Sequence, residues 1–197
     1  IETQTADSLV LETEFNRDDT PYQFTCRTGF SVSNGSLVQR LWIRNDGDRT
    51  LPFGFGLHPW FPMDDQTQLE LNVDVAFDTD DRTFPLGLTD VEGNLDFSTP
   101  SPVKPRAGLD KPFAGWTSRK ATIYQPTSDY ALDISARGAL TNVHVFIPET
   151  GGAFCVEPTS HVTDVVNRRR FAPYGDMTPL DPGQSLKGDM VLKPRLW

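Results

Sequence analysis

Apolar and polar residues alternate over several segments of the chain, with the period of two that is typical of β-strands with one buried face. The clearest segment is 69–77, "LELNVDVAF", in which every second residue is apolar. We expect one strand there. The same alternation predicts strands at 36–45 and 140–148. Shorter candidates share the pattern and lie at 8–15, 121–126, 130–136, 153–158 and 188–194.

In the strand predicted at 140–148, the alternation places different residues on the two faces. Val143 and Val145 lie on one side, and His144 and Phe146 lie on the other. Turn-rich pieces separate the predicted strands, and no window of twelve or more residues keeps the 3.6-residue period of an amphipathic helix. The pattern therefore predicts an all-β, antiparallel protein with little helix. We expect the proline-rich stretch 86–115 to be a long loop.

Composition places the chain among folded proteins with a sizeable core. Its 197 residues are 37% hydrophobic and include 13 Phe and 4 Trp, whereas disordered chains lack such residues. We expect one domain over residues 1–197. The formal net charge of −9 disfavours nucleic acid and anionic membrane surfaces as partners, because both would repel an acidic protein.

Cysteine usage and the N-terminal sequence predict a location inside the cell. Cys26 and Cys155 are the two cysteines and form no CxxC pattern, so we expect unpaired thiols in a reducing compartment. The chain contains no apolar run of 18 residues, and its first ten residues lack the basic and apolar regions of a signal peptide. These observations predict a cytoplasmic protein.

The stretch "FGFGLHPWFP" at 53–62 sets His58 among four aromatic rings. Pro59 restricts His58 to extended backbone angles, which helps to fix the direction of the imidazole. We expect His58 at the edge or rim of a sheet. Two interpretations remain open: a hydrogen-bonded histidine of the core, or a proton donor in an aromatic cleft.

Two carboxylates are further candidates for a site. Glu157 ends the apolar strand "AFCV", where burial without a partner would be costly. Two interpretations remain open: a site residue, or a rim residue exposed at the strand end. Asp110 lies in the predicted loop, where aspartates commonly cap turns. Aromatic rings near these residues, including Trp60 and Phe113, suit the apolar faces of a sugar, while carboxylates accept hydrogen bonds from its hydroxyls.

The sequence contains no motif for a helical zinc site, a dinucleotide site or a serine hydrolase site. The three histidines lack the spacing of a helical zinc motif, and a mixed histidine and carboxylate metal site stays open without a motif to support it. "GFG" at 54–56 lacks the third glycine and the strand-turn-helix context of a dinucleotide site. No GxSxG segment suggests a hydrolase. A histidine and glutamate pair in an aromatic β cleft is therefore the favoured site.

Two of these motifs resemble those of the aldose 1-epimerase (galactose mutarotase) family. They are "GLHPWF" and "FCVEPTSHVTDVVN". Further segments resemble the family in the same order, and they are "IRNDGDRTLPFGFG", "LDKPFAGW" and "LDPGQSLKGDMVLKP". The resemblance implies an antiparallel β-sandwich of the galactose mutarotase type, the supersandwich, and a cofactor-free isomerase that acts on a hexose or a close derivative.

By this resemblance, His58 is the general acid and Glu157 the general base of ring opening, while Asp110 binds a sugar hydroxyl. The family's N-terminal part supplies a further histidine and an arginine, which have no counterpart before His58. We therefore expect this chain to be the C-terminal two thirds of the family fold, either as a fragment or with the missing part supplied otherwise.

Two other functions fit the same resemblance. A non-catalytic carbohydrate-binding or regulatory module would keep the fold without turnover. A hexose-6-phosphate mutarotase would need a cationic phosphate pocket, for which Arg40, Arg44, Arg82 and 168–170 are candidates. The "HPWF" form favours an unphosphorylated sugar.

Overall fold

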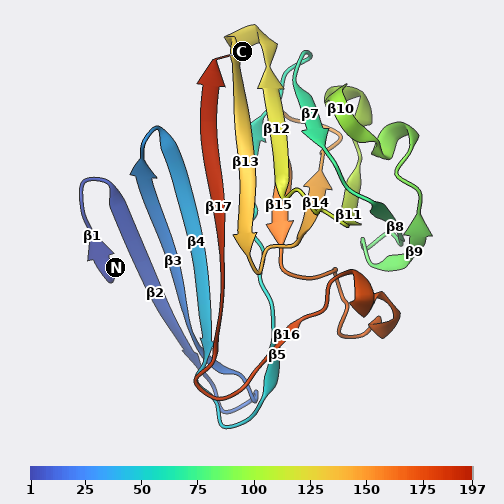
Figure 1. Ribbon diagram of the computed structural model, residues 1–197. Coiled ribbons are helices and arrows are strands. Elements are labelled where there is room, and N and C mark those ends of the chain that lie inside the picture. The colour runs from blue at the N-terminus through green and yellow to red at the C-terminus, as the bar shows by residue number, and fades with distance from the viewer. Residues whose placement is uncertain (197) are drawn as a thin grey trace.

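Antiparallel strands make up most of the protein in the computed structural model, which describes residues 1–196 (Figure 1). The strands of this part form a nine-stranded, a six-stranded and a two-stranded sheet. Its helical segments are short 3-10 turns, and they are η1 (Gly93–Leu95), η2 (Lys104–Arg106), η3 (Pro126–Ser128) and η4 (Arg169–Tyr174). None of them has the length and apolar character needed to cross a membrane. The predicted all-β class is confirmed.

The nine-stranded sheet joins the two ends of the described chain. Its spatial order is β1-β2-β3-β4-β17-β13-β12-β7-β10, so the last strand lies between the N-terminal strands and the middle of the sequence. Its strands are β1 (Thr3–Gln4), β2 (Ser8–Asn16), β3 (Gln23–Ser33), β4 (Ser36–Asn45), β17 (Ser185–Leu196), β13 (Tyr130–Gly138), β12 (Lys120–Gln125), β7 (Gln68–Leu71) and β10 (Phe97–Pro102).

The six-stranded sheet has the order β6-β15-β14-β11-β8-β9. Its strands are β6 (Trp60–Pro62), β15 (Ala153–Thr159), β14 (Asn142–Phe146), β11 (Asp110–Ala114), β8 (Val75–Thr79) and β9 (Pro85–Thr89). The small sheet pairs β5 (Leu51–Phe53) with β16 (Thr178–Leu180) and lies near the lower ends of β4 and β17 in Figure 1.

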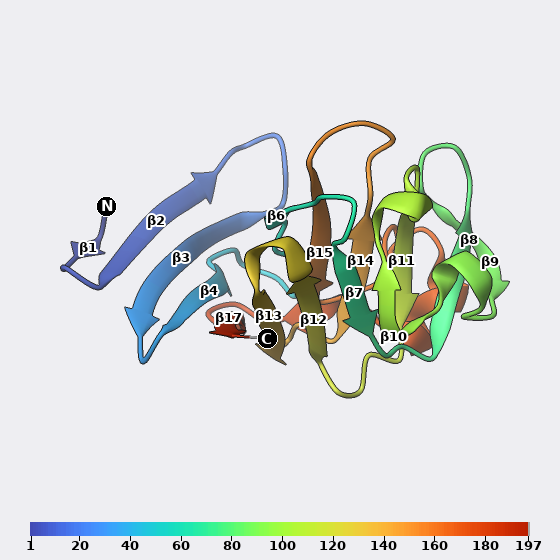
Figure 2. The same ribbon diagram turned by 90° about the horizontal axis from the view of Figure 1, so that it is seen from above.

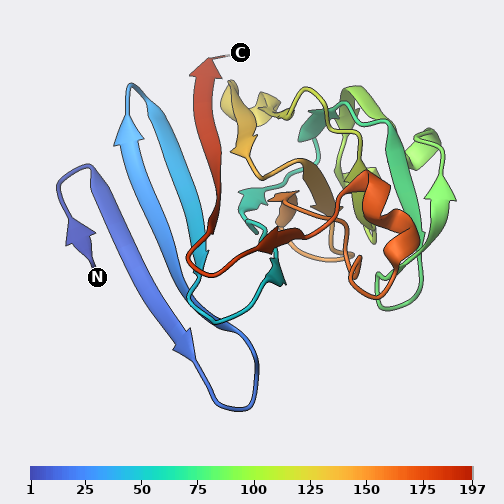
Figure 3. The same ribbon diagram turned by 60° about the horizontal axis from the view of Figure 1, so that its bottom comes forward.

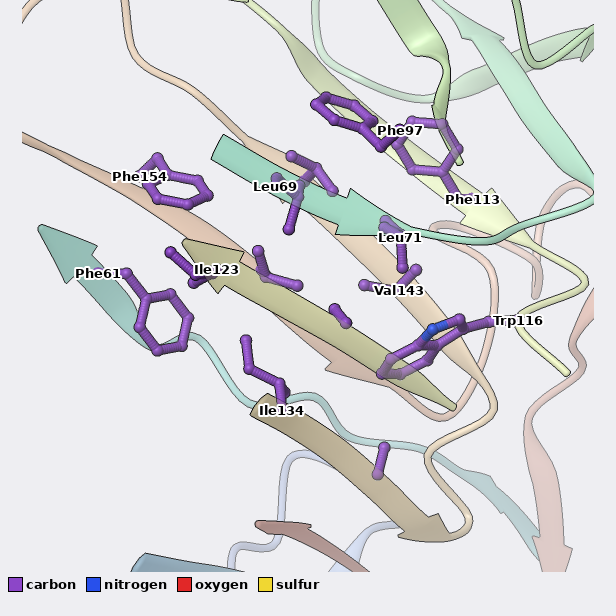
Figure 4. Packing of buried hydrophobic residues seen from close by; sticks show 14 of the residues in the cluster. Phe61, Leu69, Leu71, Phe97, Phe113, Trp116, Ile123, Ile134, Val143 and Phe154 are labelled. Atoms are coloured by element: carbon purple, nitrogen blue, oxygen red, sulfur yellow. The ribbon is translucent and has the colours of Figure 1, made fainter. Parts of the chain in front are cut away.

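The main core lies where one face of the six-stranded sheet packs against part of the nine-stranded sheet. Leu69 and Ile123 come from the larger sheet, and Val143 and Phe154 come from the smaller one (Figure 4). All four are at most 1% exposed. This sandwich of β7, β10, β12 and β13 on the six-stranded sheet is called the two-layer body below.

Strands β1 to β4 project beyond the two-layer body, and residues 1–45 are called the wing below (Figures 1 and 2). The turn between β3 and β4 is a two-residue loop in which Asn34 and Gly35 have φ angles of 49° and 71°. Asn-Gly suits such a hairpin turn, since both residues tolerate positive φ. Of the wing residues, only Thr25 and Asn45 are buried.

Three sequence-based expectations need correction. Segment 69–77 is not one strand: β7 pairs with β12 and β10 in the larger sheet, whereas β8 pairs with β11 and β9 in the smaller one. The alternation continues across the break and therefore hides it. Stretch 86–115 is not a loop, because it contains β10, β11 and most of β9. Strand β3 was not predicted.

Candidate functional site

The outer face of the six-stranded sheet collects the polar residues that the sequence pointed to. Val143, Val145 and Val156 face the core, so the alternate residues of β14 and β15 face outward. In the register, His144 lies opposite Glu157. We call this outer surface of β6, β15, β14 and the start of β11 the site face.

A second hydrophobic cluster limits the site face on one side. Phe77 of β8 contacts Phe171 and Tyr174 edge-on, with ring centroids 5.4 and 5.9 Å apart. These two rings belong to η4, which lies beside β8 and β9 (Figure 3). Asn142 fixes the same segment, since its Nδ2 donates to the Tyr174 carbonyl at 2.8 Å. The η4 segment therefore covers one end of the outer surface and leaves the polar group at the other end uncovered.

His58 lies in the loop that leads into the edge strand β6, as the sequence predicted for a rim position. The loop is held against β15, because the Leu57 amide donates to the Pro158 carbonyl at 2.9 Å. The His58 side chain is 56% exposed, so the alternative of a core histidine is wrong. Its Nε2 lies 3.2 Å from Oε1 of Glu157. The fold thus brings together two residues that are 99 positions apart.

Glu157 is the largely buried carboxylate of this group. Its side chain is 14% exposed, and burial raises its pKa above the ordinary glutamate value. His144 and His58 act in the opposite direction, because a positive imidazole beside it favours the carboxylate. A glutamate that holds its proton more tightly than usual is a stronger base when ionised.

The other imidazole nitrogen of His58 faces a thiol. Its Nδ1 lies 3.5 Å from Sγ of Cys155, which is fully buried. Cys155 lies opposite Trp60 and Phe146 in the register, and these two rings contact each other edge-on at 5.8 Å. Burial, followed by the charge of Glu157, raises the pKa of Cys155 to about 12. Cys155 and Cys26 are both unpaired, which confirms the predicted free thiols.

A second histidine and carboxylate pair lies beside the first. His144 Nε2 is 2.5 Å from Oδ1 of Asp110, with side chains 14% and 38% exposed. Asp110 is the first residue of β11, so it belongs to a sheet and not to a loop. The sequence did not identify His144 as a site residue. Its outward place in the alternation was visible, but its position opposite Glu157 depends on a pairing register that the sequence does not give.

The predicted aromatic residues differ in position. Trp60 is 53% exposed and lies beside His58, with ring centroids 5.6 Å apart, so it is free to contact a ligand. Phe113 is 1% exposed in the core, and the prediction that it lines a sugar cleft is therefore wrong. Trp116 is buried to the same extent. Phe113 was chosen because it follows Asp110 in sequence, but the strand turns its ring to the face opposite Asp110.

Comparison with known proteins agrees with this architecture. The family model described as "Aldose 1-epimerase" matches residues 1–195. The uncharacterized protein YphB of Escherichia coli strain K12 is 29% identical over 181 residues, which are 87% of this chain and 60% of YphB. The chain thus spans less than two thirds of the length of this relative.

Solved structures share the same fold. A candidate aldose 1-epimerase from Escherichia coli K12 superposes with a TM-score of 0.89 at 28% identity, over 99% of this chain and 67% of that chain. The galactose 1-epimerase of Lactobacillus acidophilus NCFM gives a TM-score of 0.74 at 15% identity, over 98% of this chain and 65% of that one. The fold is therefore the galactose mutarotase-like β-sandwich, and the chain belongs to the aldose 1-epimerase family.

Proposed function

We propose that the site face binds a free aldose and interconverts its α and β anomers by general acid and base catalysis. The observation that carries this proposal is the contact of 3.2 Å between His58 Nε2 and Glu157 Oε1 on an uncovered surface. A carboxylate and an imidazole are the two groups that this reaction needs. Membership of the aldose 1-epimerase family supports the same type of reaction, the interconversion of anomers.

The chemistry suits two groups that lie this close together. Ring opening removes a proton from the anomeric hydroxyl and adds one to the ring oxygen, and both oxygens are bonded to the same carbon. Glu157 takes the first proton and His58 gives the second. The C1–O5 bond then breaks to give the open-chain aldehyde. Rotation about C1–C2 and the reverse proton transfers close the other anomer, so no net oxidation or hydrolysis occurs.

The neighbouring residues suit sugar binding. Asp110 is partly exposed and accepts hydrogen bonds from hydroxyl groups, while the exposed ring of Trp60 offers a flat surface for C–H groups. His144 holds the Asp110 carboxylate at 2.5 Å and also lies opposite Glu157. It therefore connects the binding carboxylate with the base.

The charges of the described residues favour an unphosphorylated sugar. The arginines considered for a phosphate pocket do not gather on the site face. Arg40 and Arg44 belong to the wing and lie near Asp189 and Asp46. Arg169 forms a two-point contact with Asp176 at 2.6 Å. A phosphate at the site face would instead meet the carboxylates of Glu157 and Asp110.

Substitution of Glu157 tests the proposal. Glu157→Gln keeps the size of the side chain but cannot take a proton, so the rate of mutarotation should fall by roughly 10² to 10⁴-fold. The measurement is the optical rotation of freshly dissolved α-galactose and α-glucose over time. Glu92→Gln is the matched control and should keep the parent rate, because Glu92 is exposed and follows β9, the edge strand at the other side of the six-stranded sheet from β6. A parent rate in Glu157→Gln would refute the role of Glu157.

The pH dependence gives a second check of the same residue. Only the ionised carboxylate is a base, so the rate should fall as the pH drops through the pKa of Glu157. Because burial raises this pKa, the midpoint should lie above about 4.3, the ordinary value for glutamate. Sugar binding in calorimetry without any acceleration by the parent protein would instead favour a non-catalytic module.

A further inference from the structure

Three side chains of the site face offer a nitrogen, a sulfur and an oxygen to one point. Ligand atoms of His58, Cys155 and Glu157 all lie within 4.8 Å of one another. No other group of three or more such donors occurs in residues 1–196. The sequence gave no sign of this group, because His58 is far from the other two residues along the chain.

We propose that a thiophilic divalent cation of the Zn²⁺ type binds His58, Cys155 and Glu157 and thereby blocks the site. The binding of the cation is independent of the proposed function, whereas its inhibitory effect rests on that function. The cation is an inhibitor and not a cofactor, because it occupies the two groups that exchange protons with the sugar.

The backbone geometry suits such a site. Cys155 and Glu157 are two residues apart on β15, so both side chains project from the same face of one rigid strand. His58 comes from a loop that Pro59 and the Leu57 to Pro158 hydrogen bond hold against this strand. Two of the three ligands are therefore placed by the sheet, and the third has a fixed backbone.

Two of the contacts between donor atoms have lengths close to those in a zinc site, while one ligand atom from each residue lies within 4.8 Å of the others. Zn–N bonds of about 2.0–2.1 Å and Zn–S bonds of about 2.3 Å place the ligand atoms of a tetrahedron roughly 3.3 to 3.7 Å apart. The observed contacts are 3.5 Å from His58 Nδ1 to Cys155 Sγ and 3.2 Å from Nε2 to Glu157 Oε1. They use different nitrogens, so the exposed imidazole must rotate for one nitrogen to meet both partners.

The donor set selects the kind of cation. Thiolate and imidazole suit Zn²⁺, whereas Mg²⁺ and Ca²⁺ prefer oxygen ligands alone. On binding, the Sγ–H bond of Cys155 breaks, its proton passes to the solvent, and the sulfur lone pair forms the metal bond. The thiolate and the Glu157 carboxylate then balance the charge of the cation. The exposed side of His58 leaves the fourth position open to water.

Cobalt provides a direct test, because Co²⁺ takes zinc sites and its bonds to thiolate absorb in the near ultraviolet. We expect Co²⁺ to give this absorption with the parent chain and Zn²⁺ to abolish it. Cys155→Ser should remove the absorption and weaken Zn²⁺ binding by at least about tenfold. Cys26→Ser is the matched control and should change neither, because Cys26 lies in the wing.

The Co²⁺ and Zn²⁺ binding measurements do not depend on whether the chain has mutarotase activity. Thiolate absorption that persists in Cys155→Ser, or no absorption in the parent, would overturn the proposal. If Cys155→Ser fails to fold, His58→Asn gives the same test, since this side chain is largely exposed and should be tolerated. In that variant the affinity for Zn²⁺ should also fall at least tenfold. Cation binding without inhibition of mutarotation would overturn the proposed block and the assignment of His58 and Glu157 to catalysis, while the metal site itself would stand.

Discussion

The wing and the two-layer body consist of similar strands but differ in what covers them. In the body, Leu69, Phe154 and their neighbours are almost fully buried between two sheets. In the wing, apolar residues of β2, β3 and β4 remain partly accessible, with Leu11 36%, Val32 56% and Leu37 37% exposed. The strands of both regions are paired with their neighbours along hydrogen-bonded ladders. The difference therefore lies in side-chain burial and not in strand pairing.

Surface interactions contribute to the wing instead. Arg27 contacts Glu12 at 2.5 Å and Glu2 at 2.9 Å, and its guanidinium lies 4.9 Å from the ring of Trp42. Exposed contacts of this kind are individually weak. The site face lies on the body, where a packed core fixes the strands that carry Glu157 and His144. Rigid support of this kind is what a catalytic group needs.

Substitution of one leucine in each region sharpens this comparison most strongly. Leu69→Ala in the body should lower the free energy of unfolding by about 2 to 5 kcal/mol, because it leaves a cavity in a core position that is 0% exposed. Leu37→Ala in the wing should cost about 1 kcal/mol or less. Urea unfolding at neutral pH measures both. Equal losses in the free energy of unfolding would mean that Leu37 in the wing is buried to the same degree as Leu69 in the body.

The two thiols give a smaller contrast. Burial raises the pKa of Cys26, but the pKa of Cys155 reaches about 12 and its side chain is inaccessible. A disulfide reagent should therefore modify Cys26 in the folded chain at least about tenfold faster than Cys155. Cys26→Ser should remove the fast phase and Cys155→Ser the slow one. A reversed assignment would show that the body opens more readily than the wing.

Alternation in the sequence identified much of the fold because it is a local signal. It predicted β4 with its observed bounds and placed His144 and Phe146 on the face opposite the core. It failed at 69–77, since the apolar residues of the alternation are buried in both strands, in the main core for β7 and against η4 for Phe77 of β8. The prediction for Phe113 failed because closeness to Asp110 in sequence does not decide which face of a strand a ring occupies.

The candidate site was predictable in part, because the sequence shows residue types but not which strands pair. His58 and Glu157 stood out as an imidazole among rings and a carboxylate after an apolar strand. Their contact, however, depends on the pairing of β6 with β15. The places of Cys155 and His144 depend on the same kind of long-range register. Residue type therefore suggested the chemistry, while sheet topology decided which residues take part.

Amide NMR of the labelled chain during titration with galactose and glucose tests the central claim most directly. The claim is that the site face, and not the wing, binds an aldose. We expect shifts of the amides near His58, in β14 and in β15, while the amides of β2 and β3 stay unchanged. Shifts confined to the wing, or saturating shifts elsewhere in the body with none at the site face, would contradict it.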